Sequence, residues 1–394
     1  MSGRVVVAGV GMIPFTTPSR TETYDVMGTK AARAALADAG VAYQKIQQAY
    51  AGYVYGDSTC GQAVVYGLGQ TGIPVINVNN NCSTGSSALF LARQAVESGA
   101  VDAVLAVGFE QMQRGALAMG YTDRPTPFDR FNAVLDQIQE RDESPFAAQM
   151  FGGAGRQYAE KYGTSPEMFA KISVKSRRHA ANNPYAVFTD PVTVEEVLAS
   201  PHIYGPLTRL QCCPPTCGAA AAVLVSAEFA RANGIDTDVV IKAQAMTTDF
   251  SSTFTEKDMT KIVGYDMSKA AAQQVYEASG VSPEDLRVVE LHDCFTANEL
   301  LTYEAIGLTP EGTAEKFIND GDNTYGGRVV TNPSGGLLSK GHPLGATGLA
   351  QCAELVWQLR GQAEARQVDG VNIALQHNIG LGGAAVVTLY EKVS

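Results

Sequence analysis

Cys82 lies where the sequence predicts the start of a helix, within the segment INVNNNCSTGSSALFLAR at residues 76–93. Small residues follow the cysteine, and an apolar pattern with helical spacing follows them. Free backbone N–H groups and the helix dipole at such a position favour a thiolate, and small neighbours leave room for a substrate carbonyl. A free cysteine is nevertheless most often a buried packing residue. On its own, this segment leaves both roles open.

His342 lies in a second segment of small residues, NPSGGLLSKGHPLGATG at residues 332–348. Glycines on both sides and Pro343 after it predict a rigid turn that fixes and exposes the imidazole. A capping or core histidine is the alternative. In the second half of the chain this turn precedes a helix, as Cys82 does in the first half. Two equivalent helix starts would bring thiol and imidazole towards one pocket, the arrangement that a cysteine nucleophile needs.

The segment HDCF, residues 292–295, adds an imidazole, a carboxylate and a second thiol at the end of a predicted strand. Catalytic groups are common at the carboxyl ends of parallel strands. A metal site built from His292, Asp293, Cys294 and His342 is the alternative. Structural zinc sites usually have closely paired ligands such as C-x-x-C, which this sequence lacks, so no metal is expected.

Short apolar runs alternate with helical patterns along the chain, which predicts an α/β fold with a parallel sheet. The segment GHPLGATGLAQCAELVWQLRG has the layout of CSTGSSALFLARQAVESG, which indicates an internal duplication. We expect a first half at 1–118 plus 207–256, an inserted loop domain at 119–206 and a second half at 257–394.

Four segments in this order resemble the thiolase superfamily: NNNCSTGSSALF, HDCFTANELLTYEA, NPSGGLLSKGHPLGATGLAQ and QHNIGLGGAAVVTLYE. The combination of HDCF with HNIGLGG resembles the sterol-carrier-protein-2-type branch, and the resemblance covers the whole chain. Most thiolases have Asn-Glu-Ala-Phe in place of HDCF and a second cysteine in a late Cys-x-Gly motif. Here the corresponding segment, HNIGLGG at residues 377–383, which we call the late loop, has no cysteine. Cys294 is therefore the natural replacement for the second cysteine. The implied fold has two βαβαβαββ halves in five layers, with an inserted loop domain.

The resemblance also implies a mechanism. Cys82 attacks the C3 ketone of a 3-oxoacyl-CoA while His342 takes its proton, and Cys294 protonates the departing enolate, whose oxygen is bound by His292 and His342. Backbone N–H groups of Cys82 and Gly380 form a second oxyanion site. The resemblance implies no metal and no redox cofactor. CoA is implied as a substrate. Members of the family assemble as homodimers or homotetramers.

Other residues are weaker candidates for substrate binding. His377 and Asn378 begin the late loop and line the implied pocket, unless their role is structural. Cys212, Cys213 and Cys217 precede an apolar strand, which favours core or turn positions. Four basic residues cluster in the inserted region, where thiolases bind CoA: Lys171, Lys175, Arg177 and Arg178. These four could contact the phosphates of CoA, although a solvated helix face is the alternative for each.

Composition limits the other partners. The formal net charge is −11, so nucleic-acid binding is disfavoured. No apolar run approaches the ~20 residues of a membrane span. The N-terminus MSGRVVVAGV has no signal-peptide layout and LYEKVS is no peroxisomal signal, so we expect a cytoplasmic protein without membrane insertion.

Two rival functions remain: a steroid side-chain retro-aldolase of related fold, and a thiolase-like protein that only binds acyl-CoA or lipid. The presence of Cys82, His342 and the complete HDCF segment favours a degradative 3-oxoacyl-CoA thiolase. The acyl chain stays open between straight, 2-methyl-branched and steroid-derived groups.

Overall fold

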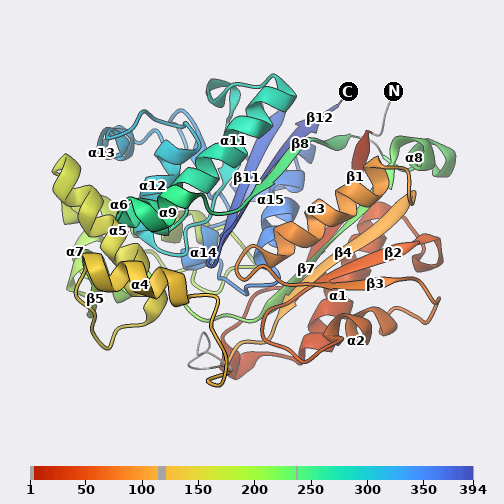
Figure 1. The fold of residues 1–394 in the computed structure, drawn as a ribbon. Coiled ribbons are helices and arrows are strands. Elements are labelled where there is room, and N and C mark those ends of the chain that lie inside the picture. Colours follow the sequence, from red (N-terminus) through yellow and green to blue (C-terminus); the bar gives the residue numbers. More distant parts are fainter. Residues whose placement is uncertain (1–3, 114–120, 237, 394) are drawn as a thin grey trace.

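The computed structural model describes residues 4–113, 121–236 and 238–393. Its core is a mixed sheet, which has ten strands in this part of the chain (Figure 1). Along the sheet, the strand order is β10-β9-β11-β12-β8-β1-β7-β4-β2-β3. The strands span Val5–Met12 (β1), Gln48–Gly52 (β2), Val75–Val78 (β3), Ala103–Glu110 (β4), Gly218–Ser226 (β7), Val239–Thr247 (β8), Val288–Glu290 (β9), Val330–Thr331 (β10), Ile373–Gly380 (β11) and Ala384–Lys392 (β12).

The sheet consists of two halves with the same strand order, β3-β2-β4-β7-β1 and β10-β9-β11-β12-β8. In the first half, β2 pairs in parallel with β3 and β4, and β7 pairs antiparallel with β4 and β1. The second half repeats this pattern around β9 and β12. The halves join where β1 pairs with β8, with Val6 opposite Val240. The duplicated α/β fold that the sequence predicts is confirmed. The expected parallel sheet is wrong, because β1, β7, β8 and β12 pair antiparallel and, among the described strands, only those around β2 and β9 pair in parallel.

The position of β8 differs from the expected division of the chain. The sequence assigns residues 207–256 to the first half, but β8 (Val239–Thr247) pairs with β12 and takes the place in the second half that β1 has in the first. The strand topology therefore divides the halves before residue 239. The half of the fold to which a strand belongs is decided by the strands that hydrogen-bond to it. Local apolar patterning in the sequence does not reveal these partners. The expected boundary between residues 118 and 119 lies outside the described residues.

Helices connect the strands so that each half follows the order βαβαβαββ. The connecting helices are Tyr24–Ala39 (α1), Cys60–Tyr66 (α2) and Thr84–Glu97 (α3) in the first half, and Tyr265–Ser279 (α11), Thr296–Ala305 (α12) and Thr347–Arg360 (α15) in the second. Shorter helices span Ala227–Asn233 (α8), Ser251–Thr255 (α9), Met259–Ile262 (α10), Ala314–Asn319 (α13) and Gly336–Ser339 (α14). No helix in the described ranges combines the length and apolar composition that crossing a membrane requires.

The two equivalent helices, α3 and α15, pack against each other at their N-terminal ends. A Cβ atom on Gly85 would lie 2.7 Å from the carbonyl oxygen of Gly345, and one on Gly348 would lie 2.1 Å from Ser86 Oγ. Glycine is therefore required for the backbones to approach this closely. The contact brings the turn before α3 next to the turn before α15, and these turns carry Cys82 and His342.

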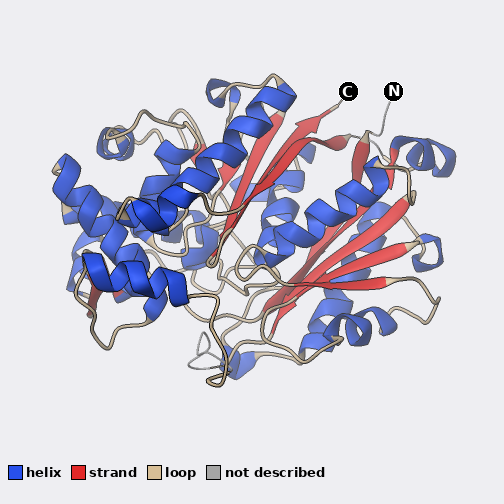
Figure 2. Cartoon of the chain, viewed as in Figure 1, coloured by secondary structure: helices blue, strands red, loops and turns tan. Residues whose placement is uncertain are grey.

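The inserted region is mainly helical. It contains Asp129–Ile138 (α4), Phe146–Tyr162 (α5), Pro166–Ala180 (α6), Val194–Ala199 (α7) and a short hairpin of β5 (His202–Tyr204) and β6 (Leu207–Thr208). Figure 2 shows these helices gathered at one side of the molecule, away from β2 and β3. Helices α5 and α6 pack against α12, which follows β9. The inserted region thus packs beside the carboxyl end of β9, which the HDCF segment follows.

A buried ion pair fastens the inserted region to the second half. Lys175 on α6 is 3% exposed and pairs with Glu299 on α12, and its Nζ also donates to Thr331 Oγ1 at 2.6 Å. Replacing Lys175 with methionine would leave the buried Glu299 carboxylate without its partner. We expect the variant to lose about 3–5 kcal/mol of unfolding free energy, measured from denaturant midpoints. A double variant, Lys175→Met with Glu299→Leu, should recover much of the loss, and equal losses in both would contradict this account.

Candidate active site

A cavity of about 540 Å³ lies between the two halves and the inserted region. Cys82, His292, Cys294 and His342 all line it. The sequence-predicted catalytic side chains are therefore brought together by turns that are far apart in the chain. The rest of the lining is mainly apolar and includes Met112, Phe128, Phe146, Phe151, Ile203, Phe295, Leu344, Ile379 and Leu381.

The asparagines before Cys82 hold its turn in place. Asn81 has φ 51°, a left-handed conformation that asparagine tolerates better than most residues. Its side-chain amide donates to the carbonyl of Leu381 at 3.1 Å, and the amide of Asn80 donates to Ser87 Oγ at 2.9 Å. Cys82 is 9% exposed and sits at the entrance to α3. The polar segment therefore fixes a thiol against the late loop.

The thiol of Cys82 is protonated at rest. Burial raises its pKa to about 12, and the nearby carboxyl group of Glu110 adds to the rise. Backbone N–H groups of Leu381 and of Cys82 itself act in the opposite direction, because they hydrogen-bond the sulfur. A nucleophilic role at this position therefore requires a base that removes the proton during the reaction.

His342 presents an unprotonated nitrogen to the cavity. Its Nδ1 lies 2.7 Å from Thr347 Oγ1, and that hydroxyl donates its own proton to the carbonyl of Pro343 at 3.0 Å. The hydroxyl can then only accept from His342, so Nδ1 carries the hydrogen and Nε2 carries the lone pair. Nε2 has no hydrogen-bond partner among the residues that the structure describes, and burial lowers the pKa of the ring to about 3. His342 is a neutral base.

His292 presents a hydrogen-bond donor, whereas His342 presents an acceptor. Its Nδ1 lies 2.8 Å from the amide nitrogen of Asn378, which donates, so the ring hydrogen is on Nε2. Burial lowers the pKa of His292 well below its usual value, so the ring is a neutral donor. The rings of His292 and His342 meet edge to face at 5.1 Å. Two neutral imidazoles thus offer one acceptor and one donor to the same space.

The metal alternative fits this geometry poorly. The ligating atoms of Cys82, His292 and His342 all lie within 4.8 Å of one another, which is close enough to surround an ion. However, His292 directs an N–H towards that space, whereas a metal needs a lone pair. Asp293 takes no part, because its carboxylate accepts the backbone N–H of Leu337 at the start of α14 at 2.7 Å.

Cys294 is a buried thiol that holds its proton. It is 4% exposed, and burial together with the neighbouring thiols of Cys213 and Cys82 raises its pKa well above the usual value. Cys213, which the sequence places in a turn or core, also lines the cavity and donates its backbone N–H to the carbonyl of Cys294 at 2.9 Å. Cys212 lines the cavity as well, whereas Cys217 is fully buried beside Met112.

Two family models match the chain: "Thiolase, N-terminal domain" at residues 5–228 and "Thiolase C-terminal domain-like" at residues 248–391. The chain belongs to the thiolase family. It is 57% identical over 392 residues to sterol carrier protein 2 of Oryctolagus cuniculus, covering 98% of this chain and 72% of that protein. It is 36% identical over 398 residues to acetyl-CoA acetyltransferase of Methanothermobacter thermautotrophicus, and the match covers 98% of this chain and 99% of that protein.

Among solved structures, this thiolase-family chain is similar to an Ltp2-ChsH2(DUF35) aldolase. The TM-score is 0.84 at 25% sequence identity, and the match covers 99% of this chain and 98% of that one. The resemblance predicted from the sequence is confirmed, including its sterol carrier protein 2 branch. The protein is therefore an acyltransferase of the thiolase family.

The late loop of this thiolase-family protein contacts Cys82 through a residue that the sequence does not single out. A Cβ on Gly380 would lie 2.1 Å from the carbonyl oxygen of Asn80, so glycine allows β11 to cross the cysteine turn. The backbone N–H that hydrogen-bonds the Cys82 sulfur belongs to the next residue, Leu381. This contact is with the sulfur, so the oxyanion donor that the sequence predicts at Gly380 stays a prediction.

The four basic residues of the inserted region do not reach the cavity in the structure. Lys175 is buried in its ion pair. Lys171 donates to Asn319 Oδ1 at 2.6 Å, Arg178 donates to Thr324 Oγ1 at 3.2 Å, and Arg177 lies over the ring of Phe188. The contacts of Lys171 and Arg178 hold α6 against the second half, whereas the contact of Arg177 lies within the inserted region. The cavity is instead lined by Arg209, which is exposed and which the sequence does not single out because it lacks basic neighbours.

Of the two late-loop candidates, only Asn378 contacts the site. Its amide donates to His292 and, at 3.2 Å, to the carbonyl of Cys82. His377 is fully buried behind His292, with its Nε2 at 2.9 Å from Ser268 Oγ. His377 therefore supports the site from behind and does not line the cavity.

Glu110 is a site residue that the sequence could have revealed. It ends the apolar run AVLAVGFE, residues 103–110, as the one acidic residue of that run, and in the structure it is fully buried. Its carboxylate accepts backbone N–H groups of Tyr55 at 2.9 Å, Val54 at 3.1 Å and Gly345 at 2.9 Å. Glu110 thereby ties the first half to the turn that carries His342.

Replacing Glu110 with glutamine should disturb this turn. The new NH₂ group would face a backbone N–H, which loses its acceptor at a cost of about 1–3 kcal/mol. We expect kcat to fall about tenfold. Burial raises the pKa of Glu110 to about 7, so protonation below this pH should slow the wild type in the same way. A pH profile of kcat should therefore lose its acidic limb near pH 7 in the variant, and an unchanged limb would contradict this role.

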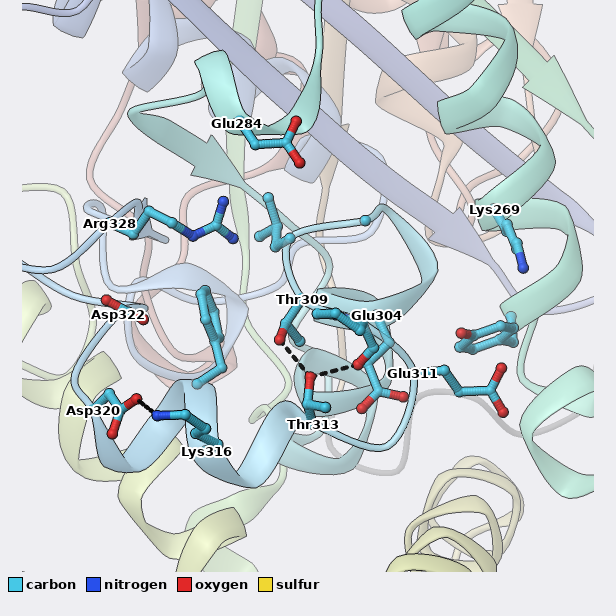
Figure 3. Close-up of a pocket in the computed structure, with 15 residues that line it drawn as sticks. Lys269, Glu284, Glu304, Thr309, Glu311, Thr313, Lys316, Asp320, Asp322 and Arg328 are labelled. Carbon is cyan, nitrogen blue, oxygen red and sulfur yellow. Dashed lines mark hydrogen bonds and ion pairs between the residues drawn. The ribbon is translucent and has the colours of Figure 1, made fainter.

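A second cavity, of about 620 Å³, lies among α11, α12 and α13 (Figure 3). Its described lining contains no cysteine or histidine, and its charged side chains have both signs. Lys316 pairs with Asp320, and Thr309 and Thr313 share a hydrogen bond of 2.6 Å. Because this lining has no base beside a nucleophilic thiol, the candidate active site is the apolar cavity around Cys82.

Proposed function

We propose that this protein is a 3-oxoacyl-CoA thiolase, which cleaves its substrate with CoA through an acyl group on Cys82. The observation that carries the proposal is the unpartnered Nε2 of His342, on a ring that has a nitrogen within 4.8 Å of Cys82 Sγ. A protonated thiol and a neutral imidazole at this separation form an activated nucleophile once the proton moves. Cys294 supplies a second proton from the same cavity.

The reaction would proceed in two stages. In the first, Cys82 gives its proton to His342 and its sulfur bonds to the C3 carbonyl carbon of the 3-oxoacyl-CoA. The C2–C3 bond then breaks, and the electron pair goes to the enolate of the shortened acyl-CoA. His292 and the protonated His342 donate to the enolate oxygen, and Cys294 protonates C2.

In the second stage, free CoA enters and gives its thiol proton to the Cys294 thiolate. Its sulfur attacks the thioester carbonyl on Cys82, and the Cys82 thiolate leaves and recovers the proton from His342. Backbone N–H groups of Cys82 and of the late loop, at Gly380 or the adjacent Leu381, would bind the carbonyl oxygen when it is negatively charged. Every proton and electron pair returns to its starting group, so no redox cofactor or metal is needed.

The cavity lining supports an apolar acyl chain. Four phenylalanine rings contribute to it, and Phe151 stacks on Phe295 at 4.9 Å directly beside Cys294. Buried apolar surface of this kind favours hydrocarbon over polar substrates. The lining is compatible with fatty-acid and sterol side-chain degradation.

Arg209 is proposed to bind a phosphate of CoA, because it is an exposed cation in the cavity lining of a chain whose net charge is −11. Arg209→Gln should raise KM for CoA about tenfold with little change in kcat, since about 1.4 kcal/mol of charge-assisted bonding is lost. Lys171→Gln is the matched control, because Lys171 lies on α6 away from the cavity. A larger rise in KM for Lys171→Gln would assign the phosphate contact to α6 instead.

A homodimer or homotetramer is proposed as the assembly. Strand β3 (Val75–Val78) is the outer strand of the first half, and most of its residues are only half-buried. An outer strand left open in this way favours pairing with another chain. Light scattering behind size-exclusion chromatography would test the assembly, and a monomer at micromolar concentration would contradict it.

A retro-aldolase is the second candidate, because the similar solved structure at TM-score 0.84 is an aldolase. Retro-aldol cleavage of a 3-hydroxyacyl-CoA releases an aldehyde or ketone and needs no acyl-cysteine. The two functions are separated by supplying 3-oxoacyl-CoA with CoA, or 3-hydroxyacyl-CoA alone, and identifying products by mass spectrometry. Two acyl-CoA products from the first mixture would support the thiolase, and cleavage of the second alone would establish the aldolase.

A further inference from the structure

A continuous line of buried hydrogen bonds runs from β12 to His292. Tyr390 OH donates to Gln376 Oε1 at 2.5 Å, and Gln376 Nε2 donates to Ser86 Oγ at 2.8 Å. Ser86 Oγ donates to Asn378 Oδ1 at 2.7 Å, and Asn378 Nδ2 donates to His292 Nδ1 at 2.8 Å. All five side chains are at most 1% exposed. The line crosses between the halves, because Ser86 belongs to α3 and the others to the second half.

Two backbone carbonyls determine the direction of these bonds. Gln376 Nε2 also contacts the carbonyl of Gly348 at 2.7 Å, and Asn378 Nδ2 contacts the carbonyl of Cys82 at 3.2 Å. A carbonyl oxygen can only accept, so in both amides the NH₂ group must face it. The hydroxyl of Ser86 receives from Gln376 and must give its hydrogen to Asn378. No alternative orientation satisfies all the buried groups of the line.

We infer that Asn378 is the positioning residue that fixes His292 as an Nε2–H donor, with Ser86 and Gln376 holding the amide of Asn378 in orientation. The inference rests on the proposed function for its consequence, because the Nε2–H would bind the enolate oxygen of the departing acyl-CoA. The tautomer itself does not depend on that function. Asn378 thus determines the role of a neighbouring ring and does not bind substrate.

The structure explains why a second residue must fix the ring. His292 and His342 are both neutral imidazoles, and they face the same space in edge-to-face contact. One ring must accept the Cys82 proton and the other must donate to an oxygen. Thr347 accepts from Nδ1 of His342, whereas Asn378 donates to Nδ1 of His292, so opposite partners give the two rings opposite tautomers.

The direct test is nitrogen-15 NMR of protein with labelled histidine rings at neutral pH. The signals of His292 are identified by their absence in His292→Gln. In the wild type, we expect His292 with a hydrogen on Nε2 and none on Nδ1. Asn378→Asp places a carboxylate where the amide donated, so Nδ1 of His292 should become protonated. A wild-type His292 protonated on Nδ1, or an Asn378→Asp variant with unprotonated Nδ1, would overturn the inference.

The kinetic consequence is measured on carbon–carbon cleavage. Asn378→Asp should lower kcat about 100-fold, the size typical of losing one oxyanion donor, while KM changes less than about twofold. Equal kcat in variant and wild type would overturn the positioning role. If the wild type has the expected tautomer but does not cleave 3-oxoacyl-CoA, the proposed function fails and the tautomer assignment stands. If the wild type cleaves the substrate but has the other tautomer, the proposed function stands and the tautomer assignment fails.

Discussion

Replacing Cys82 with alanine is expected to reduce kcat for 3-oxoacyl-CoA cleavage by about 10⁵-fold, as removal of a covalent nucleophile does in other enzymes. The alanine fits the turn without strain, because the turn is held by Asn80 and Asn81 and not by the thiol. Substrate binding should therefore survive. The measurement is the rate of 3-oxoacyl-CoA loss in the presence of CoA, together with acyl-CoA affinity by calorimetry.

Cys60→Ala is the matched control for this variant. Cys60 is also a buried free cysteine at the start of a helix, α2, but it lies outside the cavity lining. Its replacement should leave kcat within about twofold of the wild type, as expected for a residue that only packs. Cleavage that continues in Cys82→Ala would contradict the acyl-enzyme and would favour the retro-aldolase.

Replacing His342 with asparagine is expected to lower kcat by about 10³–10⁴-fold, the upper range for loss of a general base. The asparagine amide can keep the hydrogen bond from the Nδ1 position to Thr347, but it has no atom at the position of Nε2. The proton of Cys82 then has no acceptor, and the pKa of about 12 keeps the thiol protonated at neutral pH. Stopped-flow measurement of the first turnover would show the loss directly.

Two further variants make the His342 prediction specific. Thr347→Val removes the hydroxyl that fixes the ring tautomer but keeps the ring, so kcat should fall by a smaller factor of about ten. His202→Asn changes an exposed histidine in the inserted region and should have no effect. If Thr347→Val were as slow as His342→Asn, the base would depend on its partner more than on Nε2. If His342→Asn kept normal activity, the assignment of the base would be wrong.

The sequence predicts which candidate side chains meet in one cavity, for a physical reason. Cys82 and His342 precede helices that occupy equivalent places in a duplicated fold, and α3 and α15 meet through Gly85, Gly345 and Gly348. Helical patterning and glycine spacing are visible in one sequence, so the duplication and the meeting of the two turns could be inferred. The four catalytic candidates do line one cavity in the structure.

The parts that the sequence does not predict depend on long-range geometry. A cluster of basic residues on α6 suggests an anion site, but Lys175 faces inward to Glu299 and the cavity is lined by the isolated Arg209. The contact between the late loop and the Cys82 sulfur depends on how β11 crosses the cysteine turn, which places the backbone N–H of Leu381 against the sulfur. The half to which β8 belongs depends on its pairing partners.

The central claim is tested most directly by the intact mass of the protein after brief mixing with 3-oxoacyl-CoA in the absence of CoA. The account predicts a mass increase equal to the shortened acyl group on the wild type. This increase should disappear when CoA is added and should be absent in Cys82→Ala. Donors with straight, branched and ring-containing chains would rank the acyl groups that the cavity accepts. Cleavage or tight binding of these donors without any adduct on Cys82 would contradict the account.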